Sequence, residues 1–171
     1  MSDLRIGPPA SPADLEACAE LMAGSEPWLT LRRDQATCLR LLRDPSRETY
    51  VAHLGDQLAG VLVLNLQGAF VGYLQAICLA PVFRGQGLGS RLIAFTEDRI
   101  FRDHPNVFLC VSGFNHDARR LYERLGYTCV GELKDYVVPG QSEWLYRKTR
   151  GPLVTDPALG VPDPLPQSGR A

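Results

Sequence analysis

The chain has 171 residues, a length that fits a single domain with a buried core. Hydrophobic residues make up 45% of it and charged residues 22%, and the formal net charge is −1. The composition therefore lacks the basic excess that nucleic-acid and anionic-membrane surfaces select, and no apolar run approaches the roughly 20 residues of a membrane helix.

The five cysteines, at positions 18, 38, 78, 110 and 129, form no C-x-x-C pair, and most lie between apolar residues. Such cysteines are usually free, buried thiols of a reducing compartment. Together with the three histidines they form no metal motif. The N-terminal segment also lacks an apolar signal-peptide core. We therefore expect a cytoplasmic protein that holds no metal and contacts neither nucleic acid nor membrane.

The first part of the sequence predicts alternating strands and helices. Ser11 followed by Pro12 is typical of a helix start, and Gly24 of a helix end. The elements expected in chain order are a strand at 4–6, a helix at 11–24, a second helix at 31–44, a hairpin at 48–67 with its turn at 54–57, and an apolar, central strand at 69–81.

The second part continues the pattern up to residue 150. It predicts a helix at 88–100, a strand at 107–112, a helix at 115–127 that Gly126 caps, and two final strands at 128–133 and 143–148 that can pair. The fold class is therefore α/β, with a mixed sheet and about four helices in one domain, residues 3–150. Residues 151–171 are rich in proline and weakly periodic, and are predicted to be a flexible tail outside it.

Residues 82–92, VFRGQGLGSRL, place three glycines between a predicted strand and a predicted helix. A helix N-terminus exposes unpaired N–H groups and partial positive charge, and glycines let an anion approach them. Arg84 adds a fixed charge, so a phosphate or pyrophosphate is the expected guest, and a glycine-rich turn without a ligand is the alternative. The spacing fits neither the dinucleotide fingerprint nor the P-loop, which disfavours a nucleotide-binding oxidoreductase.

Two segments resemble the GNAT family of N-acetyltransferases. In that family a strand ending in V/L-x-P precedes the motif Q/R-x-x-G-x-G/A and a helix, and here Arg84, Gly87 and Gly89 match that motif. Residues 115–127 resemble the family segment N-x-x-A-x-x-L-Y-x-x-x-G-F/Y, which is matched at positions 115, 118, 121, 122, 126 and 127. The resemblance covers about residues 3–150. It implies antiparallel strands followed by a parallel pair at the coenzyme site.

The resemblance also implies acetyl-CoA as co-substrate. The loop binds its pyrophosphate, and the backbone of the preceding strand binds pantetheine. A backbone N–H near Leu79 polarises the thioester carbonyl, and Tyr122 protonates the departing thiolate. A core aromatic is the alternative role of Tyr122. The coenzyme-binding residues that the resemblance implies are Ile77, Cys78, Leu79, Arg84, Gly85, Gln86, Gly87, Leu88, Gly89, Ser90 and Asn115.

The sequence indicates the general base less clearly than the coenzyme-binding residues. Many relatives carry a glutamate on the strand before the loop, but this chain has no acid from Gly68 to Arg84. Gln75 on that strand could orient a water molecule. Glu143 is the candidate base, with a solvated strand carboxylate as its alternative. Two aromatic residues are candidates for the acceptor pocket, Trp28 and Tyr73, and Trp28 equally suits the core.

The sequence thus predicts an acyltransferase that acts on amino groups. It would move acetyl from acetyl-CoA to a small-molecule or peptide amine by direct attack in a ternary complex. The alternative is a catalytically silent module that binds acetyl-CoA as a sensor. The identity of the acceptor and the choice between monomer and homodimer stay open.

Overall fold

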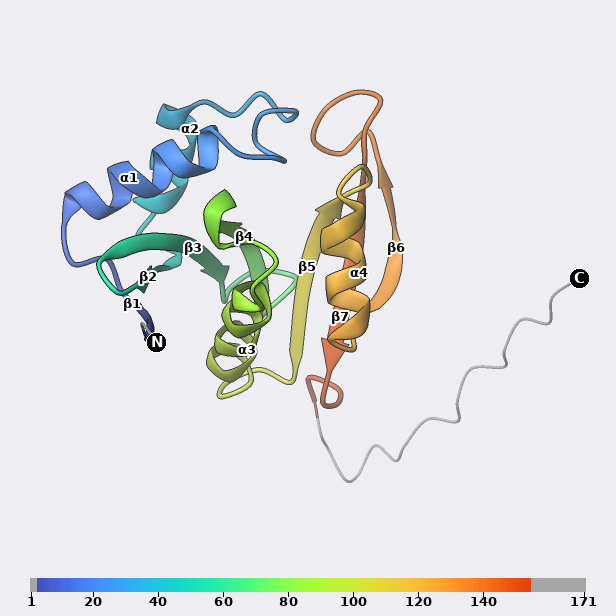
Figure 1. Ribbon diagram of the computed structural model, residues 1–171. Coiled ribbons are helices and arrows are strands. Elements are labelled where there is room, and N and C mark those ends of the chain that lie inside the picture. Colours follow the sequence, from blue (N-terminus) through green and yellow to red (C-terminus); the bar gives the residue numbers. More distant parts are fainter. Residues whose placement is uncertain (1–2, 155–171) are drawn as a thin grey trace, which may run out of the picture.

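The computed structural model describes residues 3–154 (Figure 1). Seven strands form one sheet with the order β1-β2-β3-β4-β5-β7-β6. All neighbouring strands are antiparallel except β4 and β5, which run parallel. This confirms the predicted mixed sheet with one parallel pair. The strands are β1 (Leu4–Gly7), β2 (Glu48–Leu54), β3 (Gln57–Asn65), β4 (Tyr73–Leu79), β5 (Asn106–Ser112), β6 (Thr128–Lys134) and β7 (Ser142–Thr149).

Four α-helices flank the sheet, as predicted. They are α1 (Pro12–Ala23), α2 (Gln35–Leu42), α3 (Leu88–Ile100) and α4 (His116–Arg124), and a 3-10 turn, η1 (Pro81–Phe83), follows β4. The predicted start of α1 is confirmed, because the Ser11 hydroxyl accepts the N–H of Asp14. The predicted start of α2 at residue 31 is wrong. Asp34 caps this helix by accepting the N–H of Thr37 at 2.8 Å, and Arg32 has a left-handed φ of 52°.

The strand predicted at 69–81 begins later than expected, at Tyr73. Gly72 has a φ of 86°, which is incompatible with an extended strand. A Cβ at this position would lie 2.3 Å from the carbonyl oxygen of Asn106, so the backbones of the two segments touch here. The N–H of Phe108 also donates to the carbonyl of Gly72 at 2.9 Å. Gly72 therefore fixes the point where β4 and β5 meet.

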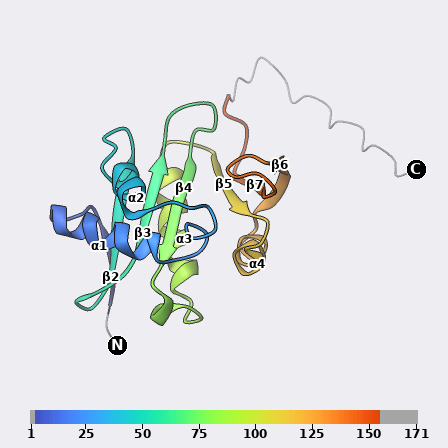
Figure 2. The same cartoon turned by 90° about the horizontal axis from the view of Figure 1, so that it is seen from above.

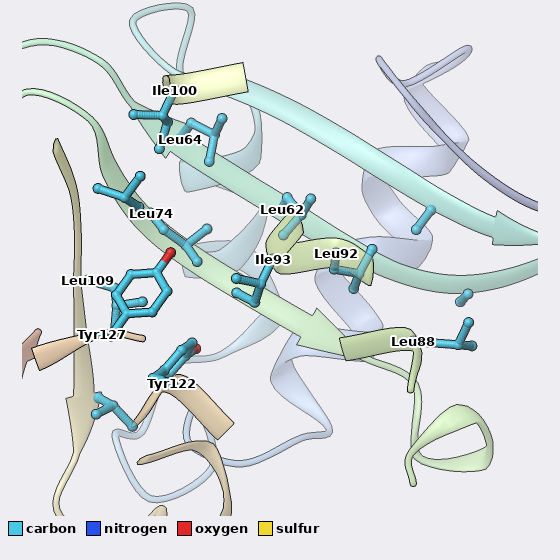
Figure 3. Close-up of a cluster of buried hydrophobic side chains, with 14 of the residues drawn as sticks. Leu62, Leu64, Leu74, Leu88, Leu92, Ile93, Ile100, Leu109, Tyr122 and Tyr127 are labelled. Carbon is cyan, nitrogen blue, oxygen red and sulfur yellow. The ribbon is translucent and has the colours of Figure 1, made fainter. Parts of the chain in front are cut away.

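The two faces of the sheet carry separate apolar cores. The larger core joins β3, β4 and β5 to α3 and α4, and Figure 3 labels ten of its residues, among them Leu62 on β3, Leu92 on α3 and Tyr122 on α4. The second core lies under α1 and α2 and contains Val61 and Cys78 from the sheet. Figures 1 and 2 show α1 and α2 together beside β2 and β3, and α4 beside β5 and β7. Of the strands, only β2, β3 and β4 contribute residues to both cores.

The five cysteines are free thiols, as predicted, but only Cys18, Cys38 and Cys78 are buried; Cys110 is half-buried and Cys129 is exposed. None of the helices among residues 3–154 is long and apolar enough to cross a membrane. The described part of the predicted tail comprises residues 151–154, and the rest of the tail lies outside the described residues.

Candidate active site

The parallel pair β4–β5 is joined at one end only. Its register contains two residue pairs, Tyr73 with Phe108 and Leu74 with Leu109. The antiparallel neighbours of these strands pair along most of their length. Beyond Leu74 the two strands separate. The middle of the sheet therefore contains a gap between the end of β4 and the end of β5.

A β-bulge in β4 accompanies this separation. The register between β3 and β4 shifts between Val63 and Leu64, so that Gln75 has no partner on β3. Bulges bend the strand that carries them. Gln75, which the sequence suggested as a residue to orient water, is this extra residue, and its side chain is exposed.

The last part of β4 has one free side. The N–H of Ala80 donates to the carbonyl of Ala59 next to β3 at 2.8 Å. Because backbone groups alternate in direction along a strand, those of Cys78 also face β3, whereas those of Ile77 and Leu79 face the gap. Of the three residues predicted to bind pantetheine, these two present backbone donors and acceptors to the gap.

The glycine loop leads from this free side into α3. Gly85 and Gly87 have φ values of 74° and 78°, and a Cβ at either position would meet nothing within 4 Å. The backbone N–H groups of residues 85–90 have no acceptor among the described residues. Arg84 stands beside them, with its Nε donating to the carbonyl of Leu79 at 3.2 Å. Converging N–H groups at a helix start, with an arginine beside them, suit a phosphate or pyrophosphate.

Tyr122 comes from α4 and lies against the larger core. Its side chain is buried, and its ring packs edge-on against Tyr127 with centroids 5.7 Å apart (Figure 3). The Tyr122 hydroxyl has no hydrogen-bond partner among the described residues, and burial raises its pKa well above the usual range for tyrosine. The phenol therefore keeps its proton at neutral pH and has it free to donate.

Glu143 lies on β7, opposite Ser112 at the end of β5. Its side chain is 5% exposed, which the alternative of a solvated carboxylate does not fit. The Ser112 hydroxyl donates to Glu143 Oε1 at 2.6 Å. Burial raises the pKa of Glu143 above its ordinary value, and the Ser112 hydrogen bond partly offsets this rise. A carboxyl group with a raised pKa is a stronger proton acceptor once it is ionised.

Two further polar side chains lie near Glu143. Tyr73, on β4, is half-buried, and burial raises its pKa far above its ordinary range. The Cys110 thiol, the Tyr136 phenol and the Glu143 carboxylate raise it further. Cys110 has a raised pKa as well, because it is buried and close to Glu143. Tyr73 and Cys110 are therefore both uncharged at neutral pH.

Two loops border the gap at the edge of the sheet where β5 ends. Figure 1 shows the α1–α2 loop and the β6–β7 loop at this edge. Trp28, in the first loop, is 7% exposed and packs into the second core. Tyr136, in the second loop, is 65% exposed and close enough to Tyr73 to affect its pKa.

The remaining predicted residue, Asn115, is the N-cap of α4. Its side-chain oxygen accepts the N–H of Ala118 at 3.2 Å. Sequence reasoning missed Ser112, Cys110 and Tyr136, which all lie near Glu143 or Tyr73. The signal that could have found Ser112 is the antiparallel register of 107–112 with 143–148, which sets it opposite Glu143. Residues 3–154 contain no cluster of side chains suited to holding a metal ion.

The model of the Acetyltransferase (GNAT) family matches residues 13–127 of this chain. The chain is also 31% identical over 147 residues to the N-alpha-acetyltransferase RimI of Mycobacterium tuberculosis, which covers 81% of this chain and 89% of that protein. An uncharacterized protein of Mycobacterium leprae is 29% identical over 147 residues, and the match spans 39% of that longer protein.

A solved structure supports the fold. The crystal structure of an aminoglycoside 6′-N-acetyltransferase complexed with coenzyme A superimposes with a TM-score of 0.69 and covers 90% of this chain and 99% of that chain. The sequence identity is 16%, so this likeness concerns the arrangement of the elements and not the details of the site.

Proposed function

This chain belongs to the GNAT acetyltransferase family, and we propose that it transfers the acetyl group of acetyl-CoA to a primary amine by direct attack in a ternary complex. The observation that carries this proposal is the run of backbone groups without partners from the end of β4 to the start of α3. The backbone groups of Ile77 and the N–H of Leu79 face the gap, and the unsatisfied N–H groups of residues 85–90 follow them in the chain. An extended thiol arm ending in a pyrophosphate fits this order of groups.

The coenzyme would be bound mainly by backbone groups. The N–H groups of residues 85–90 would bind the pyrophosphate, and Arg84 would add positive charge beside it. Backbone groups of Ile77 and Leu79 would bind the pantetheine arm, as an added strand binds a sheet edge. An N–H in this stretch would also stabilise the negative charge that develops on the thioester oxygen.

Tyr122 would be the general acid. The tetrahedral intermediate expels the coenzyme thiolate, which leaves more easily when it receives a proton. The hydroxyl of Tyr122 is protonated at neutral pH and has no hydrogen-bond partner among the described residues, so its proton is not engaged elsewhere.

Glu143 would be the general base. An amine is protonated at neutral pH and must lose a proton to become a nucleophile. A carboxylate with a raised pKa accepts this proton more readily than a solvated one. Before deprotonation, the negative charge of Glu143 would also attract the ammonium group of the acceptor.

The acceptor is proposed to be a peptide or small-molecule amine. The sequence relative is called an N-alpha-acetyltransferase, and the structural relative an aminoglycoside N-acetyltransferase, so both modify nitrogen. The similarity to the first makes peptides with a free α-amine the first class to test. Tyr73 would line the acceptor side of the gap beside Glu143.

Calorimetry with acetyl-CoA tests the coenzyme site. We expect Gly87→Val to weaken binding strongly, since its side chain would enter the space above the loop. Gly68→Val is the matched control, because Gly68 also has a left-handed φ, 92°, and open space around it but lies outside the loop. Equal affinity in the two variants would contradict the assignment.

A screen for acetyl transfer tests the reaction. The protein is incubated with acetyl-CoA and a panel of peptides with free N-termini, polyamines and aminoglycosides, and products are identified by mass. Acetylated amine is the expected result. Tight coenzyme binding without any product over the whole panel would instead favour the sensor module.

A further inference from the structure

Ser112 contacts Glu143, the proposed base, and the start of α4, the helix that carries Tyr122, the proposed acid. It is the last residue of β5 and is paired in register with Glu143 on β7. Its side chain is 2% exposed, and its hydroxyl donates to Glu143 Oε1 at 2.6 Å. The short distance and the mutual burial make this a strong hydrogen bond to a charged acceptor.

The Glu143 carboxylate depends on this one contact. Ser112 is its only hydrogen-bond donor among residues 3–154, and no arginine, lysine or histidine of the described residues pairs with it. An ionised carboxylate that is buried without a cation needs hydrogen bonds to hold its charge. Without the Ser112 hydroxyl, Glu143 would have no donor to orient its carboxylate.

The backbone of Ser112 connects to the other side of the site. Its carbonyl accepts the N–H of Asn115 at 2.9 Å. Asn115 in turn caps α4, the helix that carries Tyr122. One residue thus contacts the base through its side chain and the start of the acid-bearing helix through its carbonyl.

We infer that Ser112 is a positioning residue, whose hydroxyl orients the Glu143 carboxylate for proton transfer while its carbonyl anchors the helix that carries Tyr122. The inference rests on the proposed function, because it assigns Ser112 a role only if Glu143 acts as the base. It adds a third residue to the machinery, one that no motif in the sequence indicates.

The side chains that face Glu143 do not change charge in the pH range in which its carboxyl group ionises. Tyr73 on β4 and Cys110 on β5 have raised pKa values, so both stay neutral where a glutamate ionises. Tyr136, in the β6–β7 loop, lies on the Tyr73 side of this group. A shift of the low-pH limb between the wild-type protein and Ser112→Ala, measured with the same amine, therefore reports Glu143 and not these neighbours.

The first test measures the ionisation of Glu143 directly, without substrate. The protein is labelled with 13C at the glutamate carboxyl carbons, and the Glu143 signal is assigned by its loss in Glu143→Gln. Ser112→Ala should raise the Glu143 midpoint by about one pH unit, because the lost hydrogen bond favoured the ionised form. Ser112→Thr, which keeps the hydroxyl, should restore it.

Ser142→Ala is the matched control. The Ser142 hydroxyl donates to Glu132 Oε1 at 2.6 Å, a serine–glutamate bond of the same length next to Glu143 on the same strand. This variant should leave the Glu143 midpoint unchanged. An equal midpoint in Ser112→Ala and Ser142→Ala would overturn the inference even if Ser112→Thr does not fold.

The second test uses turnover with acetyl-CoA and the best amine of the screen. In Ser112→Ala the low-pH limb of kcat/KM should move to higher pH by the same amount as the NMR midpoint. An unmoved limb, in a protein whose Glu143→Gln variant has lost turnover, refutes the role of Ser112 alone. Full turnover in Glu143→Gln would refute the base itself, and the inference with it.

Discussion

The two halves of the sheet are built differently. In the first half, β1 to β4, the strands β2, β3 and β4 lie between the two cores, with α3 packed on one face and α1 and α2 on the other. Strands β5, β7 and β6 have α4 on one face, and the second core contains none of their residues. The face that this core leaves uncovered holds Cys110, Ser112 and Glu143.

This difference suggests a division of roles, in which the first half mainly stabilises the fold and the second half carries the polar groups of the proposed site. The first half buries apolar side chains on both faces, which is the main source of folding free energy. The second half leaves one face for polar and titratable groups, which a two-sided core would have to exclude or pair. The gap between β4 and β5 lies at the boundary, so a substrate bound there, as proposed, would contact both halves.

The largest expected effect is a loss of unfolding free energy at Gly72, where β4 of the first half meets β5 of the second. In Gly72→Ala the new Cβ would meet the Asn106 carbonyl oxygen at 2.3 Å and Ile100 Cγ2 at 2.7 Å, in a backbone with φ of 86°. Overpacking and left-handed strain together should cost about 3–5 kcal/mol of unfolding free energy. Denaturant unfolding measures this loss.

Gly68→Ala measures the cost of a left-handed backbone without the close contact that an added Cβ makes at Gly72. Gly68 has a similar φ of 92°, but its added Cβ would meet nothing within 4 Å. It should therefore cost only about 1 kcal/mol, the strain alone. If the two variants lost equal stability, the close contact between the halves would have no energetic importance.

The next effect concerns Tyr122 at the edge of the gap. Tyr122→Phe keeps the ring, so packing and the KM for acetyl-CoA should change little, whereas kcat should fall roughly tenfold to thousandfold if the phenol is the acid. Tyr127→Phe is the matched control. Its hydroxyl is also buried without a hydrogen-bond partner in the described residues, and its ring packs against Tyr122. Equal kcat values in the two variants would refute the assignment of Tyr122.

The sequence predicted the local backbone of the glycine loop and of α4 better than it predicted the contacts around Glu143. The glycine loop and the α4 segment are local motifs, in which neighbouring residues determine backbone direction and capping. Gly87 and Asn115 therefore could be placed at helix starts without knowledge of the fold.

The acceptor side depends on strand pairing, which local pattern does not determine. Ser112 and Glu143 are 31 residues apart, and they meet only because β7 pairs with β5 as well as with β6. The bulge at Gln75 was equally unforeseeable, since it arises from a register shift between β3 and β4 and not from a glycine or proline signal.

The smallest expected effects are on stability, and they have opposite signs in the two halves. Glu48, on β2, receives two hydrogen bonds from Arg99, at 2.5 and 2.8 Å, and one from Tyr50 at 2.7 Å. Burial raises its pKa, but these hydrogen bonds outweigh burial and hold the pKa below its ordinary value. Glu143, in contrast, has a raised pKa because it is buried with a single neutral donor.

Glu48→Gln should therefore destabilise the protein at neutral pH, and Glu143→Gln should stabilise it, each by about 1 kcal/mol after solvent screening. The ionised Glu48 favours the folded state, and this contribution is lost as the pH falls through its lowered pKa. The ionised Glu143 disfavours the folded state, so the wild-type protein recovers stability as the pH falls through its raised pKa toward the ordinary value. Melting temperatures of the three proteins from pH 8 down to about pH 2 measure both differences. The gain in Glu143→Gln should vanish at a higher pH than the loss in Glu48→Gln, since the two pKa values lie on opposite sides of the ordinary one. A destabilised Glu143→Gln at pH 8 would show that the carboxylate is solvated or paired, and that the uncovered face of the second half does not hold a buried base.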